Sequence, residues 1–233
     1  MKLIRAIKRL KISINKARLS ITGIIACLVI FSLPANTIET FNRLGIEVPD
    51  PPSLNARSAI LIDAATGTVL YEKEADQSLP PASLAKLVTL HIAMEEIKSG
   101  RLSLDEIIEI DPQDCSPSIP YGSSLMYLQP RMKVSVRDLM LGAAVVSGND
   151  AAYALARRIA GSNEKFAQMM NDEVKAMGFQ NLSFVEPSGL SEFNLVTARD
   201  FAFFCKKYIE LHPKALKELH SIHSIRFPRP EHA

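Results

Sequence analysis

The sequence has little of what marks several common classes of protein. Its 233 residues include only three cysteines, and their spacing suits neither a metal cage nor a scaffold held by several disulfides. It contains no glycine-rich phosphate-binding pattern, and no internal repeat or low-complexity tract is visible. We therefore expect no metal ion and no other cofactor, and we expect Cys115 and Cys205 to be two thiols, although one disulfide between them stays open.

Basic residues are scarce outside the N-terminus. The first eighteen residues hold seven lysines and arginines and no acidic residue. Without these seven, the other 20 basic residues face 25 acidic ones, a net charge of −5. Because nucleic-acid binding needs a concentrated basic surface, we expect no nucleic-acid partner.

The basic N-terminus leads into a short apolar run, Ile21 to Leu33. A run of this length after a positive segment is typical of a secretory signal, since a bilayer-spanning helix needs about 20 apolar residues. We predict that residues 1–35 are a signal peptide or an N-terminal anchor, that residues 36–57 are a proline-containing linker, and that residues 58–233 are the folded domain. The protein is then exported, to the periplasm or the outer face of the cytoplasmic membrane, with membrane association through the N-terminal segment as an open alternative.

The domain starts with a hairpin and continues mainly as helices. Residues 59–63 and 68–72 are predicted strands joined by a turn. A helix of about 16 residues should start at Ser83, and residues 111–130 have the composition of loops with small helices. Further helices are predicted through residues 136–143, over 151–159 with Asp150 as N-cap, from about 163 to 177, and over 198–209 with Thr197 as N-cap.

The pattern Ser-x-x-Lys occurs three times and carries little information by itself. Its copies start at Ser13, Ser83 and Ser162. Ser13 lies in the predicted export segment, and Ser162 begins a polar helix whose Lys165 should point to water. Only the copy at Ser83 opens an apolar helix.

Lys86 lies on the apolar face of that helix, in line with Leu90, Ala93 and Ile97. Desolvation lowers the pKa of a buried lysine toward the range where the amine accepts a proton. A neutral amine one turn from Ser83 can act as general base for its hydroxyl, and a helix N-terminus favours the negative charge of acyl transfer. The alternatives are that Ser83 only caps the helix and that Lys86 extends to solvent.

A second polar group, Ser147-Gly148-Asn149, falls on a turn between two predicted helices. A second hydroxyl can relay a proton, and an asparagine amide can both donate to and accept from a peptide-like substrate. The alternative is an ordinary interhelical turn, which this composition also favours.

The histidines are not expected to form a site. His91, inside the apolar helix, should be a packed and hydrogen-bonded core residue. The remaining histidines are expected to be solvated and lack metal-site spacing: His212, His220, His223 and His232.

Together these motifs resemble the low-molecular-mass penicillin-binding proteins, the serine D-alanyl-D-alanine carboxypeptidases. The resemblance rests on PASLAK (residues 81–86) and SGNDAA (residues 147–152), which appear in the family's order. It extends to AILIDAATG (residues 59–67), FVEPSGL (residues 184–190) and TARD (residues 197–200).

The resemblance implies an α+β fold of the penicillin-binding and serine β-lactamase type, with an antiparallel sheet, flanking helices and a helical subdomain. It implies Ser83 as nucleophile, Lys86 as base, Ser147 as proton relay and Asn149 as a contact to substrate and lysine. The implied substrate is a peptidoglycan stem peptide ending in D-Ala-D-Ala, and β-lactams would acylate Ser83.

One part of the family pattern is absent. The tripeptide Lys-Thr-Gly, which the family carries on a strand beside the nucleophile, occurs nowhere in the 233 residues. We therefore expect a chain that is truncated at its C-terminus and lacks the later strands. The alternatives are an inactive remnant, a peptidoglycan- or penicillin-binding module, and a serine β-lactamase.

Overall fold

The computed structural model describes residues 51–228, and the chain divides into two units, residues 1–54 and 55–233. The predicted export segment (1–35) and most of the predicted linker (36–57) lie outside the described residues. Where the structure is described, no helix has both the length and the apolar character that crossing a membrane requires.

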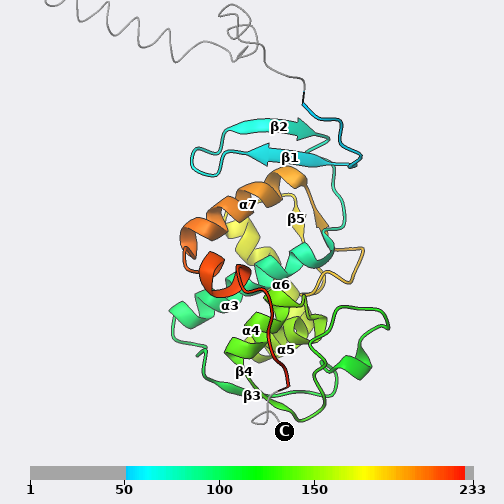
Figure 1. Cartoon of the computed structure of the whole chain (residues 1–233), viewed down its shortest axis with the longest axis vertical. Helices are drawn as coiled ribbons and strands as arrows, with labels where there is room; N and C mark the ends of the chain where they lie inside the picture. Colours follow the sequence, from blue (N-terminus) through cyan, green and yellow to red (C-terminus); the bar gives the residue numbers. More distant parts are fainter. Residues whose placement is uncertain (1–50, 229–233) are drawn as a thin grey trace, which may run out of the picture. The chain divides into compact units, whose positions relative to one another are not determined.

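The second unit opens with the predicted hairpin (Figure 1). Strands β1 (Ala59–Ile62) and β2 (Val69–Lys73) pair antiparallel. The Asp63 carboxylate fixes their connection, because it accepts hydrogen bonds from the backbone N–H and the hydroxyl of Thr66, both at 2.7 Å. The sequence prediction of a hairpin is confirmed.

Two further antiparallel pairs are too short to show a period in the sequence and were not predicted. β3 (Ile107–Glu109) pairs with β4 (Lys133–Ser135), and β5 (Leu182–Ser183) pairs with β6 (Leu195–Val196). Each pair joins the two ends of a loop, residues 110–132 in the first case and 184–194 in the second.

The predicted helices downstream are all present. They are α4 (Val136–Val145), α5 (Asn149–Ala160), α6 (Asn163–Ala176) and α7 (Ala198–Leu211), with short turns of helix η2 (Ser116–Ser118) and η3 (Leu216–His220). The side chains of Ser135, Ser162 and Thr197 cap α4, α6 and α7 by accepting a backbone N–H of the first turn. The hairpin packs against α7.

The predicted N-cap of α5 is wrong. The cap position is Gly148, and the fully buried Asp150 turns its carboxylate to a distant loop. It accepts the backbone N–H groups of Met126 at 2.8 Å and Leu128 at 2.9 Å, and the hydroxyl of Ser116 at 3.0 Å. The same carboxylate also accepts the backbone N–H of Ala151 in α5 at 2.9 Å, so Asp150 binds the loop from within the first turn of the helix instead of from the cap position.

The helix predicted from Ser83 begins differently. A 3₁₀ turn, η1 (Ala82–Ala85), comes first, and α3 (Lys86–Lys98) follows without interruption. Ala82 enters this turn with a φ of +49°, in the left-handed region.

Helix α3 is the centre of the unit because it contributes to two hydrophobic cores. Leu90 and Ala93 pack into the first core, with α4 and α5. Val88 and Ile92 face the second core, with α6 and α7. Because α3 is held by apolar side chains on two sides, the position of its first turn is fixed.

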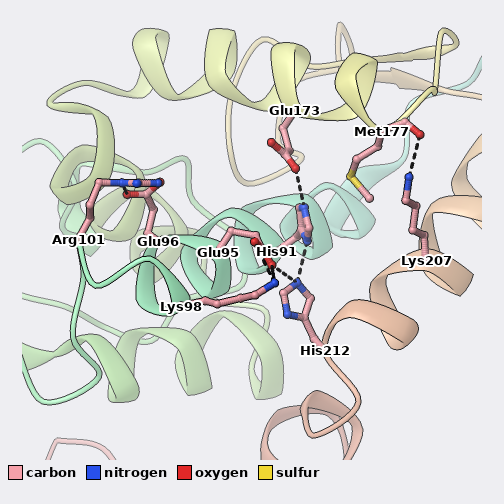
Figure 2. Close-up of polar contacts among 9 residues, drawn as sticks. All are labelled: His91, Glu95, Glu96, Lys98, Arg101, Glu173, Met177, Lys207 and His212. Atoms are coloured by element: carbon pink, nitrogen blue, oxygen red, sulfur yellow. Dashed lines mark hydrogen bonds and ion pairs between the residues drawn. The ribbon is translucent and has the colours of Figure 1, made fainter.

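His91 also lies in α3, and it joins α6 to the end of α7 (Figure 2). Its Nε2 lies 3.0 Å from Glu173 Oε1, and its Nδ1 lies 2.8 Å from His212 Nε2. Because a carboxylate only accepts, His91 donates from Nε2 and accepts at Nδ1. The expectation for His91 is confirmed, whereas the expectation that His212 is solvated is wrong, since 8% of its side chain is exposed.

We predict that His212 makes stability depend on pH. Burial lowers the pKa of His212 to about 4, with a contribution from His91, while the unfolded chain titrates near 6.5. Between these values the unfolded state binds the extra proton, so the free energy of unfolding falls as pH drops from about 6.5 to 4. Urea unfolding across this range should show a shallower fall for His212→Gln than for wild type.

The exposed His223 supplies the control. His223→Gln should keep the wild-type slope, because this exposed side chain lies outside the hydrogen-bonded group of His91, Glu173 and His212. Parallel slopes for His212→Gln and wild type would contradict the prediction.

Candidate functional site

Ser83 and Lys86 meet where η1 passes into α3. Side chains three residues apart are aligned in a 3₁₀ turn, and Lys86 Nζ lies 3.0 Å from Ser83 Oγ. Ser83 is exposed, and Lys86 is 3% exposed. The turn thus places an accessible hydroxyl against a buried amine.

The two alternatives for this pair are not what the structure shows. No side-chain hydrogen bond caps η1 or α3, so Ser83 is not a helix cap. Lys86 does not extend to solvent, because it lies in the protein with two hydrogen-bond acceptors: Ser83 Oγ and, at 2.8 Å, the carbonyl oxygen of Ser188.

The amine is shifted toward its neutral form. Burial lowers the pKa of Lys86 to about 8, while the negative charges of Glu186 and Asp150 act in the opposite direction. A lysine with this pKa supplies neutral amine near neutral pH, which an exposed lysine does not.

A loop that the sequence pattern did not assign to the site covers Lys86. The carbonyl of Ser188 accepts from Lys86, and the carbonyl of Pro187 accepts from Thr89 Oγ1 at 2.7 Å. These contacts join residues 98 and 102 positions apart in the sequence. The segment FVEPSGL (residues 184–190) was noted for its resemblance to the family, but nothing in its sequence indicates that it contacts α3.

Gly189 brings the loop against the turn that carries Ser83. A Cβ at this position would lie 1.8 Å from the carbonyl oxygen of Ala82 and 3.0 Å from the backbone nitrogen of Ser83. The φ of Gly189 is +87°. Only glycine satisfies both the approach and the dihedral angle.

Ser147 lies on the connection between α4 and α5, and Asn149 is the first residue of α5; both helices pack on α3. Ser147 has a φ of +57°, which is unusual for a residue with a side chain. Asn149 is buried, and its Oδ1 has no hydrogen-bond partner in the described part of the chain. A buried amide oxygen without a partner is costly and calls for an explanation, such as a catalytic role or a partner from outside the chain.

The structure therefore brings Ser83 and Lys86 into contact and leaves the other two predicted residues without a direct bond to them. Between residues 51 and 228 no hydrogen bond joins Lys86 to Ser147 or Asn149. Asp150, the residue after Asn149, does act on the lysine: its negative charge, in the first turn of α5, raises the pKa of Lys86.

The other described Ser-x-x-Lys copy shows the contrast. Ser162 Oγ accepts the backbone N–H of Lys165 at 3.2 Å as a helix cap, and Lys165 is exposed as predicted. Spacing alone does not make a site; burial of the lysine distinguishes the pair at residues 83 and 86.

Neither described cysteine nor any cluster of possible ligands forms a metal centre in residues 51–228. Cys115 and Cys205 are free thiols. No group of three or more His, Cys, Asp or Glu side chains in this part of the chain is arranged to hold a metal ion.

Comparison with known proteins gives one consistent family. A family model described as D-alanyl-D-alanine carboxypeptidase matches residues 46–229. The carboxypeptidase DacF of Bacillus subtilis (strain 168) is 35% identical over 156 residues, 66% of this chain and 39% of that protein. DacC of Escherichia coli (strain K12) is 39% identical over 163 residues, 69% of this chain and 41% of that protein. The chain thus spans about two fifths of the length of these relatives.

Solved structures share the fold. The D-alanyl-D-alanine carboxypeptidase DacD from Francisella tularensis has a TM-score of 0.69 at 40% identity, covering 74% of this chain and 41% of that chain. Penicillin-binding protein D2 from Listeria monocytogenes, in its ampicillin-bound form, has a TM-score of 0.62 at 31% identity, covering 72% and 68%. The predicted α+β fold of the penicillin-binding type is confirmed.

We predict that Gly189→Ala destabilises the protein more than a change of dihedral angle alone explains. An alanine forced into the left-handed region costs roughly 1–2 kcal/mol, and the clash with Ala82 should add about 1–3 kcal/mol. Urea unfolding of the variant and of wild type gives the total loss in the free energy of unfolding.

Gly161→Ala is the matched control, because Gly161 has a φ of +82° and no atom within 4 Å of the position that a Cβ would take. The free energy of unfolding of Gly161→Ala should fall only by the cost of placing alanine in the left-handed region. Equal losses in the two variants would mean that Gly189 does not need its close approach.

Proposed function

Because the chain belongs to the D-alanyl-D-alanine carboxypeptidase family, we propose that it acts as a serine acyl hydrolase on peptidoglycan stem peptides ending in D-Ala-D-Ala. The observation that carries the proposal is the 3.0 Å contact between the exposed hydroxyl of Ser83 and the buried amine of Lys86. A hydroxyl is a weak nucleophile until a base takes its proton, and burial gives Lys86 the pKa that this task needs.

The proposed reaction has two steps. The neutral amine of Lys86 takes the proton of Ser83 Oγ as that oxygen bonds to the carbonyl carbon between the two D-alanines. The C–N bond breaks, the proton passes to the leaving amine through Ser147, and free D-alanine departs. Water then attacks the Ser83 ester, which restores the hydroxyl and releases the shortened peptide.

Asn149 is proposed to contact the substrate. Its amide can accept a peptide N–H and donate to a peptide carbonyl. Its unpaired, buried Oδ1 supports this assignment.

β-Lactams should acylate the same serine. Their strained amide presents a carbonyl carbon to Ser83 in place of the D-Ala-D-Ala bond, and the ring holds the leaving nitrogen nearby. Penicillin-binding protein D2 of Listeria monocytogenes, which shares the fold, was solved in its ampicillin-bound form, and this supports extending the chemistry to the present chain.

We also propose that the protein is exported. The basic start and the apolar run of residues 21–33 support a signal peptide or N-terminal anchor. Either would deliver the domain to the periplasm or the outer face of the cytoplasmic membrane, where peptidoglycan is found.

We predict that fluorescent penicillin labels the chain covalently and that Ser83→Ala abolishes the label. Ser162→Ala is the control, because it alters the other described Ser-x-x-Lys copy and removes only a helix cap, worth about 1 kcal/mol. Denaturing gels after incubation, with circular dichroism to confirm folding, give the measurement.

Other outcomes would favour other functions. A folded wild-type chain without label would support a binding module or an inactive remnant. Label that forms and is lost within seconds would point to a serine β-lactamase.

We also predict that the rate of acylation rises with pH and reaches half its plateau near pH 8. Only the neutral amine can take the serine proton, and the pKa of Lys86 is lowered to about 8. The second-order labelling rate between pH 5.5 and 9.5 gives the midpoint. A rate that is constant or falls over this range would exclude Lys86 as the base.

A further inference from the structure

The carboxylate of Glu186 organises the loop over Lys86, residues 186–194. Six donors form hydrogen bonds with the two oxygens of this carboxylate. Oε1 accepts from Gly189 N (2.6 Å), Ser191 N (3.2 Å) and Asn194 Nδ2 (2.7 Å), and Oε2 accepts from Ser188 N (2.7 Å), Ser188 Oγ (2.6 Å) and Tyr153 Oη (3.2 Å).

The loop so folded holds three groups against the site. The carbonyl of Ser188 accepts from Lys86 Nζ, the carbonyl of Pro187 accepts from Thr89, and Gly189 lies against the turn of Ser83. Ser188 and Asn194 are both fully buried. A backbone without regular structure keeps such a position only when its N–H groups are satisfied, and here the Glu186 carboxylate satisfies three of them.

We propose, on the basis of the function proposed above, that Glu186 is a positioning residue whose carboxylate holds residues 187–189 over Lys86 and thereby keeps the lysine amine within reach of Ser83.

Glu186 is not itself placed to act as a base. A carboxylate offers about four lone-pair sites, and six donors already occupy its oxygens. A water molecule or a serine hydroxyl in the site would have to displace one of these bonds. The residue therefore acts through the backbone that it orders.

Glu186 also acts on the charge of Lys86. The carboxylates that act on the amine are Glu186 from the loop and Asp150 from α5, and both raise its pKa against the effect of burial. Loss of the Glu186 charge should lower the pKa of Lys86. An acidic residue that stabilised the fold from a place remote from the amine would not move this value.

The test is Glu186→Gln in the full chain, with Glu192→Gln as matched control. Glu192 is exposed in the same loop, so its substitution should change neither readout. The side-chain amide that Glu186→Gln introduces has an NH₂ group in place of one acceptor oxygen, so it cannot accept all six donors and the loop should shift. Since a displacement of about 1 Å can cost 100-fold in rate, we expect penicillin acylation to fall about 100-fold.

The second readout is the pKa of Lys86, measured from the Cε resonance of ¹³C-labelled lysine and assigned by its loss in Lys86→Arg. We expect a lower pKa in Glu186→Gln and an unchanged pKa in Glu192→Gln. An acylation rate and a pKa that both equal those of wild type in folded Glu186→Gln would overturn the proposal.

The two readouts separate this proposal from the proposed function. If wild type is not acylated, the proposed function fails, while the Lys86 resonance still decides whether Glu186 controls the lysine. If Glu186→Gln does not fold, Tyr153→Phe removes one donor to the carboxylate. A reduced acylation rate in Tyr153→Phe then supports the proposal, and an unchanged rate overturns it.

Discussion

The amine of Lys86 lies at the first turn of a helix that is buried between two hydrophobic cores, where a charged group without partners is costly. Helix α3 cannot move to relieve this cost, because Leu90 and Ala93 hold it on one side and Val88 and Ile92 on the other. Other parts of the chain must therefore supply the hydrogen-bond acceptors of the lysine. One acceptor is Ser83 Oγ in the preceding 3₁₀ turn, and the other is the carbonyl of Ser188, about a hundred residues further along the chain.

Two acidic side chains, the partly buried Glu186 and the buried Asp150, bring irregular backbone into position. Glu186 collects the N–H groups of its own loop, and Asp150 collects those of Met126 and Leu128 from the loop before α4. In both cases a carboxylate replaces the strand partner that such backbone would otherwise need. The same two charges act on Lys86. The walls of the site and the electrostatics of its lysine thus depend on the same residues.

Local patterns in the sequence were enough to predict the hairpin, the helices and the burial of Lys86, because each depends on residues within two or three turns. The apolar positions after Ser83 predicted that Lys86 faces the core, and the structure places it there. Rules for local capping failed at Asp150, because this residue lies inside the first turn of α5 and binds three donors of a distant loop that the local sequence does not record. His212 and the Glu186 loop were missed for a related reason: their partners in α3 lie 121 and about 100 residues away, and no periodicity records such a contact.

The polar groups of the site fall into two sets, and the division bears on the proposed chemistry. Those that hold Lys86 are satisfied: the amine has two acceptors, and Glu186 has six donors. Asn149 keeps a buried oxygen without a partner in the described residues, and Ser147, two residues before it, is in the left-handed region. Unsatisfied groups and strained backbone persist only where the surrounding structure enforces them. Because both occur where α4 leads into α5, they support the proposal that this part of the site meets the substrate, while the proposed role of the Glu186 loop is to hold Lys86.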